Sequence, residues 1–258
     1  MTNDAYLQIL SHFNLEENAI EATPFGNGHI NDTLKVTTSS GKGKYILQRI
    51  NHHIFTNVDM LQNNIHIVTS HIRKKLEERN ETDIDRKVLT FLPTKEGKLY
   101  YHDGENYWRV CLMIPDSKSL EEVNPELSYE AGKAFGDFQS MLADIPEGTL
   151  GETIPDFHNM EFRLRQFHDA LEANAADRLD KVKDLVEEIE KRAKAMCIQE
   201  DLYREGKLKK RINHCDTKVN NILFDNNSGK VLCVIDLDTV MPGYVLSDIG
   251  DFIRTGAN

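Results

Sequence analysis

The chain has 258 residues, of which 40% are hydrophobic and 28% charged, a balance typical of a globular protein and not of a disordered one. Its net charge of −11 disfavours a nucleic-acid-binding protein, which would carry a basic face. The chain is long enough for one large domain or for two lobes that share a cleft.

The N-terminus and the cysteines bear on the compartment. The opening Met-Thr-Asn-Asp lacks the basic and apolar regions of a signal peptide, and no apolar run approaches the length of a membrane span. The cysteines show no Cys-x-x-Cys spacing, which suits free thiols in a reducing compartment; they are Cys111, Cys197, Cys215 and Cys233. We therefore expect a cytoplasmic protein that binds neither nucleic acid nor membrane, and the sequence predicts no oligomeric state.

A glycine turn follows a predicted amphipathic helix at residues 4–13. Gly26 and Gly28 bracket Asn27, His29 follows, and the turn runs into an alternating strand. Two such glycines let backbone N–H groups approach phosphates, although most turns of this kind are only hairpins. The candidate phosphate-binding residues are Gly26, Asn27, Gly28 and His29.

The return strand at 44–50 is expected to supply a cation for the same phosphate groups. No lysine lies in its middle, so Arg49 is the candidate, with Gln48 on the opposite face of the strand. A helix at 58–76 follows, and it has Asp59 near its start and no other acid before Glu77. An ion pair between the strand cation and a helix carboxylate is therefore in doubt.

Further strands are predicted at 88–91, 98–102 and 107–114, before Pro115 breaks the pattern. We interpret 115–119 as a hinge between two lobes, whose backbone would bind adenine. The chain then becomes helical, and the predicted helices lie at 127–143 and 177–195. The predicted fold is α+β, with an antiparallel-sheet lobe at 1–114 and a mainly helical lobe at 115–258.

Between those two helices lies a polar segment that begins at Pro155. Its residues Phe157, His158 and Asn159 would line a substrate pocket at the mouth of the second lobe. A helix N-cap is an equally good interpretation of the same residues.

The stretch from His214 to Asp238 carries the strongest signal. The run His-x-Asp-x-x-x-x-Asn from His214 to Asn221 has the spacing of the protein-kinase catalytic loop. A turn at 225–229 between apolar runs predicts a hairpin, which would bring Asn221 close to Asp236. Asparagine plus aspartate is a hard oxygen pair suited to Mg²⁺ carrying ATP phosphates, with Asp238 assisting.

Within the same stretch, Asp216 would accept a proton from a substrate hydroxyl. Lys218, two residues further on, would offset charge on the transferring phosphoryl group. The residue after His214 is Cys215 where protein kinases have arginine. Small-molecule kinases of the aminoglycoside phosphotransferase and choline kinase superfamily share the spacing and lack that arginine, so the stretch resembles theirs.

Three stretches together resemble the N-acetylhexosamine 1-kinase family of that superfamily. They are Gly-Asn-Gly-His-Ile-Asn-Asp-Thr at 26–33, Tyr-Ile-Leu-Gln-Arg-Ile-Asn at 45–51 and Ile-Asp-Leu-Asp-Thr-Val-Met-Pro-Gly at 235–243. The segment Phe157–Asn159 is similar to a stretch that contributes to the sugar site in that family. The resemblance implies ATP- and Mg²⁺-dependent phosphorylation of the anomeric hydroxyl of N-acetylglucosamine or N-acetylgalactosamine, with sugar contacts from Phe157, His158 and Asn159.

The chain departs from the family pattern at two points, and the resemblance adds one further expectation. Asn63 lies where relatives often have glutamate, and the chain stops at Asn258 where relatives carry further helices, so we expect an incomplete second lobe. Asp248 matches a superfamily aspartate that braces the catalytic loop, and we expect a structural role for it.

The residues of this sequence argue against three other classes of function. A mucin-desulfating sulfatase would need a cysteine or serine followed by proline two positions on, and none of the cysteines has it. A metal hydrolase would need clustered ligands such as His-Glu-x-x-His, which are absent from the sequence. A non-catalytic nucleotide-binding module would lack Asp216, Asn221 or Asp236. Choline, homoserine, methylthioribose and aminoglycosides stay open as alternative acceptors.

Overall fold

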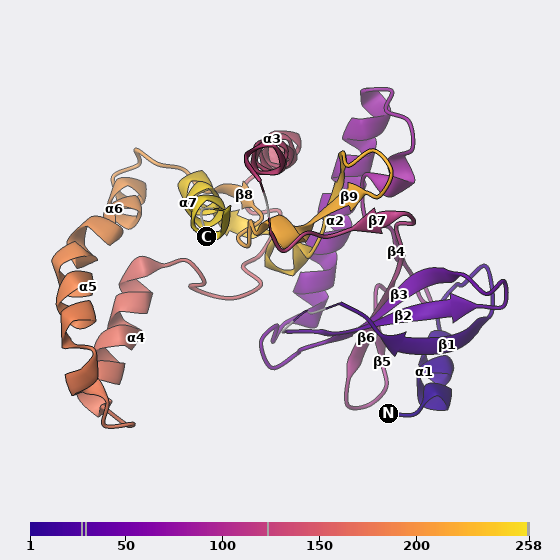
Figure 1. Ribbon diagram of the computed structural model, residues 1–258, viewed down its shortest axis with the longest axis horizontal. Helices are drawn as coiled ribbons and strands as arrows, with labels where there is room; N and C mark the ends of the chain where they lie inside the picture. The colour runs from indigo at the N-terminus through magenta and orange to yellow at the C-terminus, as the bar shows by residue number, and fades with distance from the viewer. Residues whose placement is uncertain (27, 29, 123, 257–258) are drawn as a thin grey trace.

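The computed structural model describes residues 1–26, 28, 30–122 and 124–256. It confirms the predicted α+β, kinase-like arrangement, because an antiparallel sheet is followed by a largely helical region (Figure 1). Within the described residues, no helix is long and apolar enough to cross a membrane.

The N-terminal sheet has the strand order β1-β2-β3-β6-β4, with β5 paired to β6. All its pairings are antiparallel, and in the middle of the sheet Leu47 lies opposite both Leu34 and Val110. The strands are β1 (Ala19–Pro24), β2 (Asp32–Thr38), β3 (Gly43–Ile50), β4 (Phe91–Leu92), β5 (Tyr101–His102) and β6 (Tyr107–Leu112).

The two faces of this sheet have different roles. Tyr45 and Leu47 of β3 pack in a buried cluster with α1 (Asn3–Leu10), so this face is closed. Successive side chains of a strand point to opposite faces. Gln48 therefore lies on the other face, the one on which Ile50 packs in a cluster with α2 (Val58–Glu78).

Helix α2 joins the sheet to the rest of the molecule. Its N-cap, Asn57, accepts a hydrogen bond from the Met60 N–H at 3.0 Å, which satisfies one donor of the first turn. Further along, the buried Asn64 side chain donates to the carbonyls of Gly151 and Val240. These bonds fix α2 against the second lobe.

The chain passes between the lobes at Pro115 and Asp116. Arg86, in η1 (Ile84–Arg86), donates to the carbonyl oxygens of both residues and to Asp225 at 2.7 Å. The next residues form β7 (Ser117–Lys118), which pairs with β9 of the second lobe. The crossing is thus held on both sides, and the lobe boundary at residue 114 stays a prediction.

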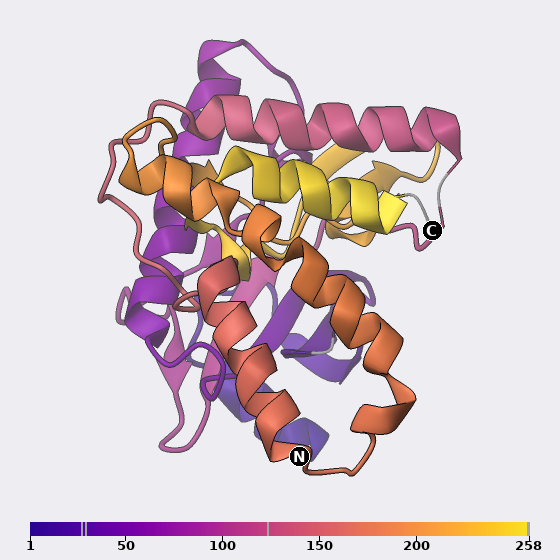
Figure 2. The same ribbon diagram turned by 90° about the vertical axis from the view of Figure 1, so that its left-hand side faces the viewer.

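The second lobe is built around two helices that lie side by side, α3 and α7 (Figures 1 and 2). The Phe135 and Phe252 rings meet there at 5.9 Å between centroids. Two small sheets, β10-β9-β7 and β11-β8, lie beside them. The elements are α3 (Pro125–Leu142), β8 (Arg211–Asn213), η3 (Val219–Asn221), β9 (Ile222–Asp225), β10 (Val231–Val234), η4 (Leu237–Thr239), β11 (Met241–Gly243) and α7 (Val245–Gly256).

The remaining helices form an arm on the side away from the N-terminal sheet (Figure 1). They are α4 (Met160–Ala173), α5 (Lys183–Met196) and α6 (Ile198–Arg204), with the short η2 (Leu179–Lys181) before α5. Every residue of these helices is described and none is buried.

Candidate active site

The loop between β8 and η3 is held from behind by Asp248 of α7. One carboxylate oxygen accepts from the His214 N–H and the other from the Cys215 N–H, each at 2.9 Å. Gln139 of α3 donates to the same carboxylate at 2.8 Å. Asp248 is 2% exposed, so these are buried bonds, and the bracing expected for this residue is what the structure shows.

Replacing Asp248 with alanine should lower the free energy of unfolding by about 3 kcal/mol, because two buried N–H groups would lose their acceptor. Urea unfolding followed by circular dichroism measures this loss. Asp137→Asn is the matched control, since Asp137 makes an ion pair with Arg79 in which both side chains are largely exposed; it should cost less than about 1 kcal/mol. Equal losses in the two variants would contradict a bracing role.

The His214 ring fixes the same loop to the turn that follows β10, in which Asp236 lies. Its Nε2 lies 2.9 Å from the carbonyl oxygen of Ile235, so this nitrogen is the donor. Phe135 and Phe138 pack edge-on against the ring. The backbone also joins the two segments, because the Ile235 N–H donates to the Asn221 carbonyl at 2.9 Å.

Asp216, Lys218 and Asn221 lie together as the spacing predicted. The Lys218 Nζ is 2.9 Å from one Asp216 carboxylate oxygen and 3.0 Å from the other. The Asn221 amide nitrogen donates to the Asp216 carbonyl at 2.8 Å and to its carboxylate at 3.1 Å. The Asp216 side chain is 22% exposed, so it is oriented by its neighbours and still open to a ligand.

Asp236 lies beside this group with its backbone in the left-handed region, at φ 60° and ψ 57°. Among the described residues, no hydrogen-bond donor reaches its carboxylate. The residue is exposed to solvent, yet protein surrounds its carboxylate closely, and this desolvation, together with the charge of Asp238, raises the pKa of Asp236 to about 6. A carboxylate in such a place favours a bound cation.

The donor atoms here suit Mg²⁺. The amide nitrogen of Asn221 is committed to Asp216, which leaves the amide oxygen for another partner, and the Asn221 carbonyl is joined to the segment that carries Asp236 by the Ile235 N–H. Within the described part of the chain, no cluster of three or more His, Cys, Asp or Glu side chains could hold a metal. A pair of oxygen ligands is what Mg²⁺ uses when substrate phosphates complete its shell.

Asp238 is engaged differently from Asp236. Its carboxylate forms a two-pronged ion pair with Arg109 of β6, at 2.5 and 2.9 Å, and also accepts from the Asn31 amide. Asp238 is 2% exposed and Arg109 3%. Arg109 was not predicted as a site residue, because the sequence around it indicated only a strand.

The structure describes Gly26, Gly28, Gln48 and Arg49 among the predicted nucleotide-binding residues of the N-terminal lobe. Gly26 has φ 76°, a backbone conformation that glycine adopts freely, whereas Asn27 and His29 lie outside the described residues. Gln48 accepts a hydrogen bond from the Arg109 Nε at 2.9 Å, which places it on the face turned to Asp238.

Arg49 lies on the face of the sheet opposite to Gln48. Its guanidinium donates to Asp32 at 2.7 Å and to Asn106 at 3.1 Å, both at the exposed edge. The strand alternation that separates Arg49 from Gln48 therefore directs it away from Asp236 and Asp238. This geometry does not support the phosphate contact expected for Arg49.

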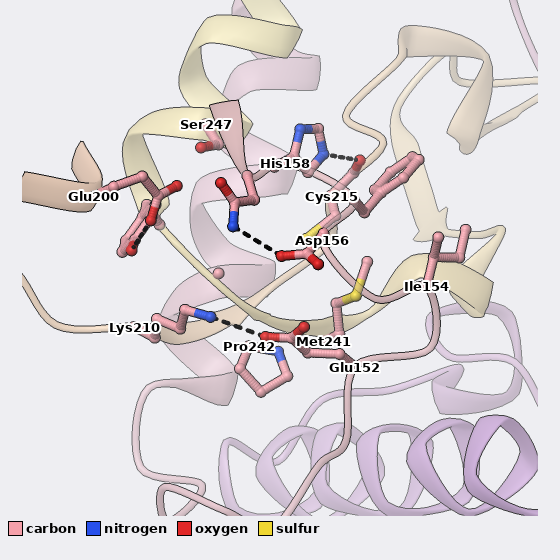
Figure 3. Close-up of a pocket in the computed structure, with 14 residues that line it drawn as sticks. Glu152, Ile154, Asp156, His158, Glu200, Lys210, Cys215, Met241, Pro242 and Ser247 are labelled. Carbon is pink, nitrogen blue, oxygen red and sulfur yellow. Dashed lines mark hydrogen bonds and ion pairs between the residues drawn. The ribbon is translucent and has the colours of Figure 1, made fainter. Parts of the chain in front are cut away.

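A pocket borders the catalytic loop on its other side (Figure 3). The His158 Nε2 lies 2.8 Å from the Cys215 carbonyl oxygen, in the peptide bond that leads to Asp216. Phe157 packs edge-on against the His158 ring. The enclosed volume is about 60 Å³, less than the roughly 300–1,000 Å³ of a complete ligand site, so the pocket alone would hold only part of a sugar.

Asn159 lines the pocket and also caps α4. Its side-chain oxygen accepts from the Phe162 N–H at 3.1 Å, and its nitrogen donates to Asp156 at 2.8 Å. The sequence left open whether this segment was a pocket wall or a helix cap, and Asn159 belongs to both.

Several pocket residues were not predicted from the sequence. Lys210 pairs with Glu152 at 2.8 Å, and the Tyr244 hydroxyl donates to Glu200 at 2.7 Å. Lys210 lies in a short run rich in basic residues at 207–211. Its partner is far away in sequence, so no local pattern could have identified it.

A braced Asp-Lys-Asn loop next to a free carboxylate, under an antiparallel sheet, defines a kinase-like phosphotransferase. Residues 21–258 match the model of the phosphotransferase enzyme family (APH). The chain belongs to this family.

Solved structures agree with the fold. The chain is similar to an aminoglycoside phosphotransferase from Alicyclobacillus acidocaldarius, with 16% identity and a TM-score of 0.63 over 99% of this chain and 71% of that one. It is also similar to spectinomycin phosphotransferase APH(9)-Ia in complex with ADP and spectinomycin, with 12% identity and a TM-score of 0.56 over 100% and 80% of the two chains. A third is APH(3'')-Id from Streptomyces rimosus in complex with ADP and streptomycin, with 11% identity and a TM-score of 0.54 over 99% and 85%.

Proposed function

We propose that this phosphotransferase uses ATP and Mg²⁺ to phosphorylate the anomeric hydroxyl of N-acetylglucosamine or N-acetylgalactosamine. The observation that carries the proposal is the orientation of the Asp216 carboxylate by Lys218 and Asn221, beside a pocket that contacts the same loop through His158.

The reaction requires that the acceptor hydroxyl is oriented toward the phosphate and that its proton is accepted. Phosphoryl transfer through a loose transition state leaves little covalent work to the protein. The Asp216 carboxylate would orient the sugar hydroxyl and take its proton, and Lys218, at 2.9 Å from that carboxylate, would offset charge on the moving phosphoryl group. A bound Mg²⁺ supplies charge neutralisation on the phosphates.

Nucleotide binding is assigned to the face of the sheet turned to the second lobe. Asn221 and Asp236 would hold the metal through their side-chain oxygens, which accept no hydrogen bond from the described residues. Gly26, Gly28 and Gln48 would contact the phosphates from the N-terminal lobe. The solved relatives in complex with ADP share this fold, which supports ATP as the donor here.

The acceptor side is polar, as a sugar requires. Glu152, Asp156 and Glu200 line the pocket with His158 and Asn159, and each can bond to hydroxyl groups. The resemblance of 26–33, 45–51 and 235–243 to N-acetylhexosamine 1-kinases selects the amino sugar over choline or homoserine. An aminoglycoside is the second candidate, because the pocket carboxylates would also suit an amine.

A panel of hydroxyl acceptors with ATP and Mg²⁺, followed by ADP release, tests the proposed function. The panel should contain both N-acetylhexosamines, choline, homoserine, methylthioribose and an aminoglycoside. We expect turnover with the N-acetylhexosamines at least about 10-fold above the rate without acceptor, since an oriented acceptor contributes far more than that. Turnover with choline or an aminoglycoside alone would move the substrate assignment, and ADP release with no acceptor dependence would contradict it.

Replacing His158 with alanine should raise the KM for the hexosamine by about 10-fold, which corresponds to roughly 1.4 kcal/mol of lost binding. The KM for ATP should not change, because His158 lies on the Cys215 side of the loop. Steady-state kinetics with each substrate varied measures both constants. His168→Ala is the control. His168 lies in α4, the helix that follows His158, and pairs with Glu190 at the surface. A change in the ATP constant alone would show that this segment does not contact the sugar.

A further inference from the structure

The buried ion pair between Arg109 and Asp238 joins the two lobes at the metal-binding turn. Arg109 belongs to β6 of the N-terminal sheet, and Asp238 lies in η4, two residues after Asp236. Both side chains are almost completely buried, at 4% and 3% exposure. Burying two charges is expensive unless geometry and additional hydrogen bonds repay the cost.

Those additional bonds come from the nucleotide-facing surface of the sheet. The Arg109 Nε donates to Gln48, and Gln48 in turn donates to the Thr33 hydroxyl at 3.1 Å. The guanidinium also lies over the Phe91 ring, 5.4 Å from its centroid. Arg109 is thus fixed in position by β2, β3 and β4 before it reaches Asp238.

Asn31 makes a second connection to the same carboxylate. Its amide nitrogen donates to Asp238, while its amide oxygen accepts from the Asn51 N–H at 2.9 Å. Asn31 directly precedes β2 at the end of the glycine turn. The glycine turn, the end of β3 and the metal-binding turn are therefore joined through one carboxylate.

The turn that receives these bonds needs external support. Asp236 has a left-handed backbone, which is uncommon for a residue other than glycine and persists only where the surroundings hold it. From the second lobe, the turn is held by the His214 ring on Ile235 and by the Thr239 hydroxyl on the His214 carbonyl. From the N-terminal lobe, side chains reach the turn at Asp238 and, through Asn64 of α2, at the Val240 carbonyl oxygen.

We propose that Arg109 is a positioning residue: through Asp238 it holds the Asp236 turn in the orientation that binds the metal–nucleotide complex. Arg49, the predicted strand cation, lies on the opposite face of the sheet and takes no part in these bonds. Asp238 then positions Asp236 and is not itself a metal ligand. This inference rests on the proposed function for the nucleotide, whereas the effect on the turn does not depend on it.

The test must separate positioning from stability, since removing one partner leaves a buried unpaired charge. The double variant Arg109→Met/Asp238→Leu removes both charges, and such replacements of a buried pair are often neutral or stabilising. Arg109→Lys is a second variant, because lysine keeps the charge and loses the two-pronged geometry. Arg79→Gln/Asp137→Asn is the control, at an exposed pair of the same type between α2 and α3.

Two measurements are made on each protein besides its melting temperature. Amide hydrogen exchange of residues 237–240 reports the turn, and calorimetry with Mn²⁺ and ADP, compared with ADP in EDTA, reports metal–nucleotide binding. In the double variant we expect a melting temperature close to that of the wild type. Exchange in the turn should be at least about 10-fold faster and the Mn²⁺–ADP dissociation constant about 10–100-fold higher, as for other groups that orient metal ligands. ADP binding in EDTA and the control variant should stay unchanged.

Wild-type exchange and wild-type Mn²⁺–ADP affinity in a folded double variant would overturn the positioning role. Failure of both Arg109 variants to fold would overturn it as well, because the role is claimed to be separable from stability. A wild-type protein without Mn²⁺–ADP affinity would contradict the proposed function, and the exchange measurement would still decide the role of Arg109.

Discussion

Replacing Asp216 with asparagine should lower kcat by about 10²–10⁴, the size of a general-base contribution. Asparagine keeps the shape of the side chain and its contact with Lys218, but an amide does not take up the proton of the sugar hydroxyl. The KM for ATP should stay close to the wild-type value, since Asp216 is not one of the residues proposed to hold the metal and the phosphates. ADP release at saturating N-acetylhexosamine and Mg²⁺ measures the change.

The control for this variant is Asp169→Asn, at an exposed position of α4. It should leave both constants unchanged. If Asp216→Asn keeps more than about a tenth of the wild-type kcat, Asp216 is not the base, given the expected size of that contribution.

Replacing Asp236 with asparagine should reduce turnover by at least about 10³, because the charged metal ligand is lost. The fold should survive this change. Desolvation and Asp238 raise the pKa of Asp236 to about 6 in the folded protein. The unfolded chain therefore loses this proton first, and the free energy of unfolding falls as the pH rises from about 4 to 6. At pH 7.5 without metal, the neutral amide should therefore melt at the wild-type temperature or above it.

A thermal shift separates lost binding from lost folding in this variant. Mg²⁺–ADP should raise the melting temperature of the wild type, since a ligand that binds only the folded state stabilises it. The same mixture should leave the melting temperature of Asp236→Asn nearly unchanged. A full shift in the variant, or near-normal turnover, would show that Asp236 does not hold the metal.

The sequence predicted those parts of the fold that depend on local pattern. The helix predicted at 58–76 is α2 (Val58–Glu78), and the hairpin predicted around the turn at 225–229 is formed by β9 and β10. Strands β1, β7 and β11 were not predicted. β11 has three residues, includes Pro242, and exists because it pairs with β8, so its strand character comes from a distant partner.

The candidate site divides in the same way. The contacts among Asp216, Lys218 and Asn221 follow from the spacing of one loop. The choice between Arg49 and Arg109 could not follow from spacing, because both lie on strands and only the register of β3 with β6 shows which face each takes. In that register Gln48 lies opposite Arg109 and Arg49 opposite the buried Trp108.

Identification of the phosphorylated product tests most directly the claim that this protein transfers a phosphoryl group to the anomeric hydroxyl of an N-acetylhexosamine. The protein is incubated with ATP, Mg²⁺ and N-acetylglucosamine or N-acetylgalactosamine, and the product is observed by ³¹P NMR with coupling to the anomeric proton. The methyl glycoside of each sugar, which lacks a free anomeric hydroxyl, is the matched control. We predict a sugar 1-phosphate from the free sugars and no phosphorylated product from the glycosides; phosphorylation of the glycosides, or a phosphate at any other carbon, would contradict the claim.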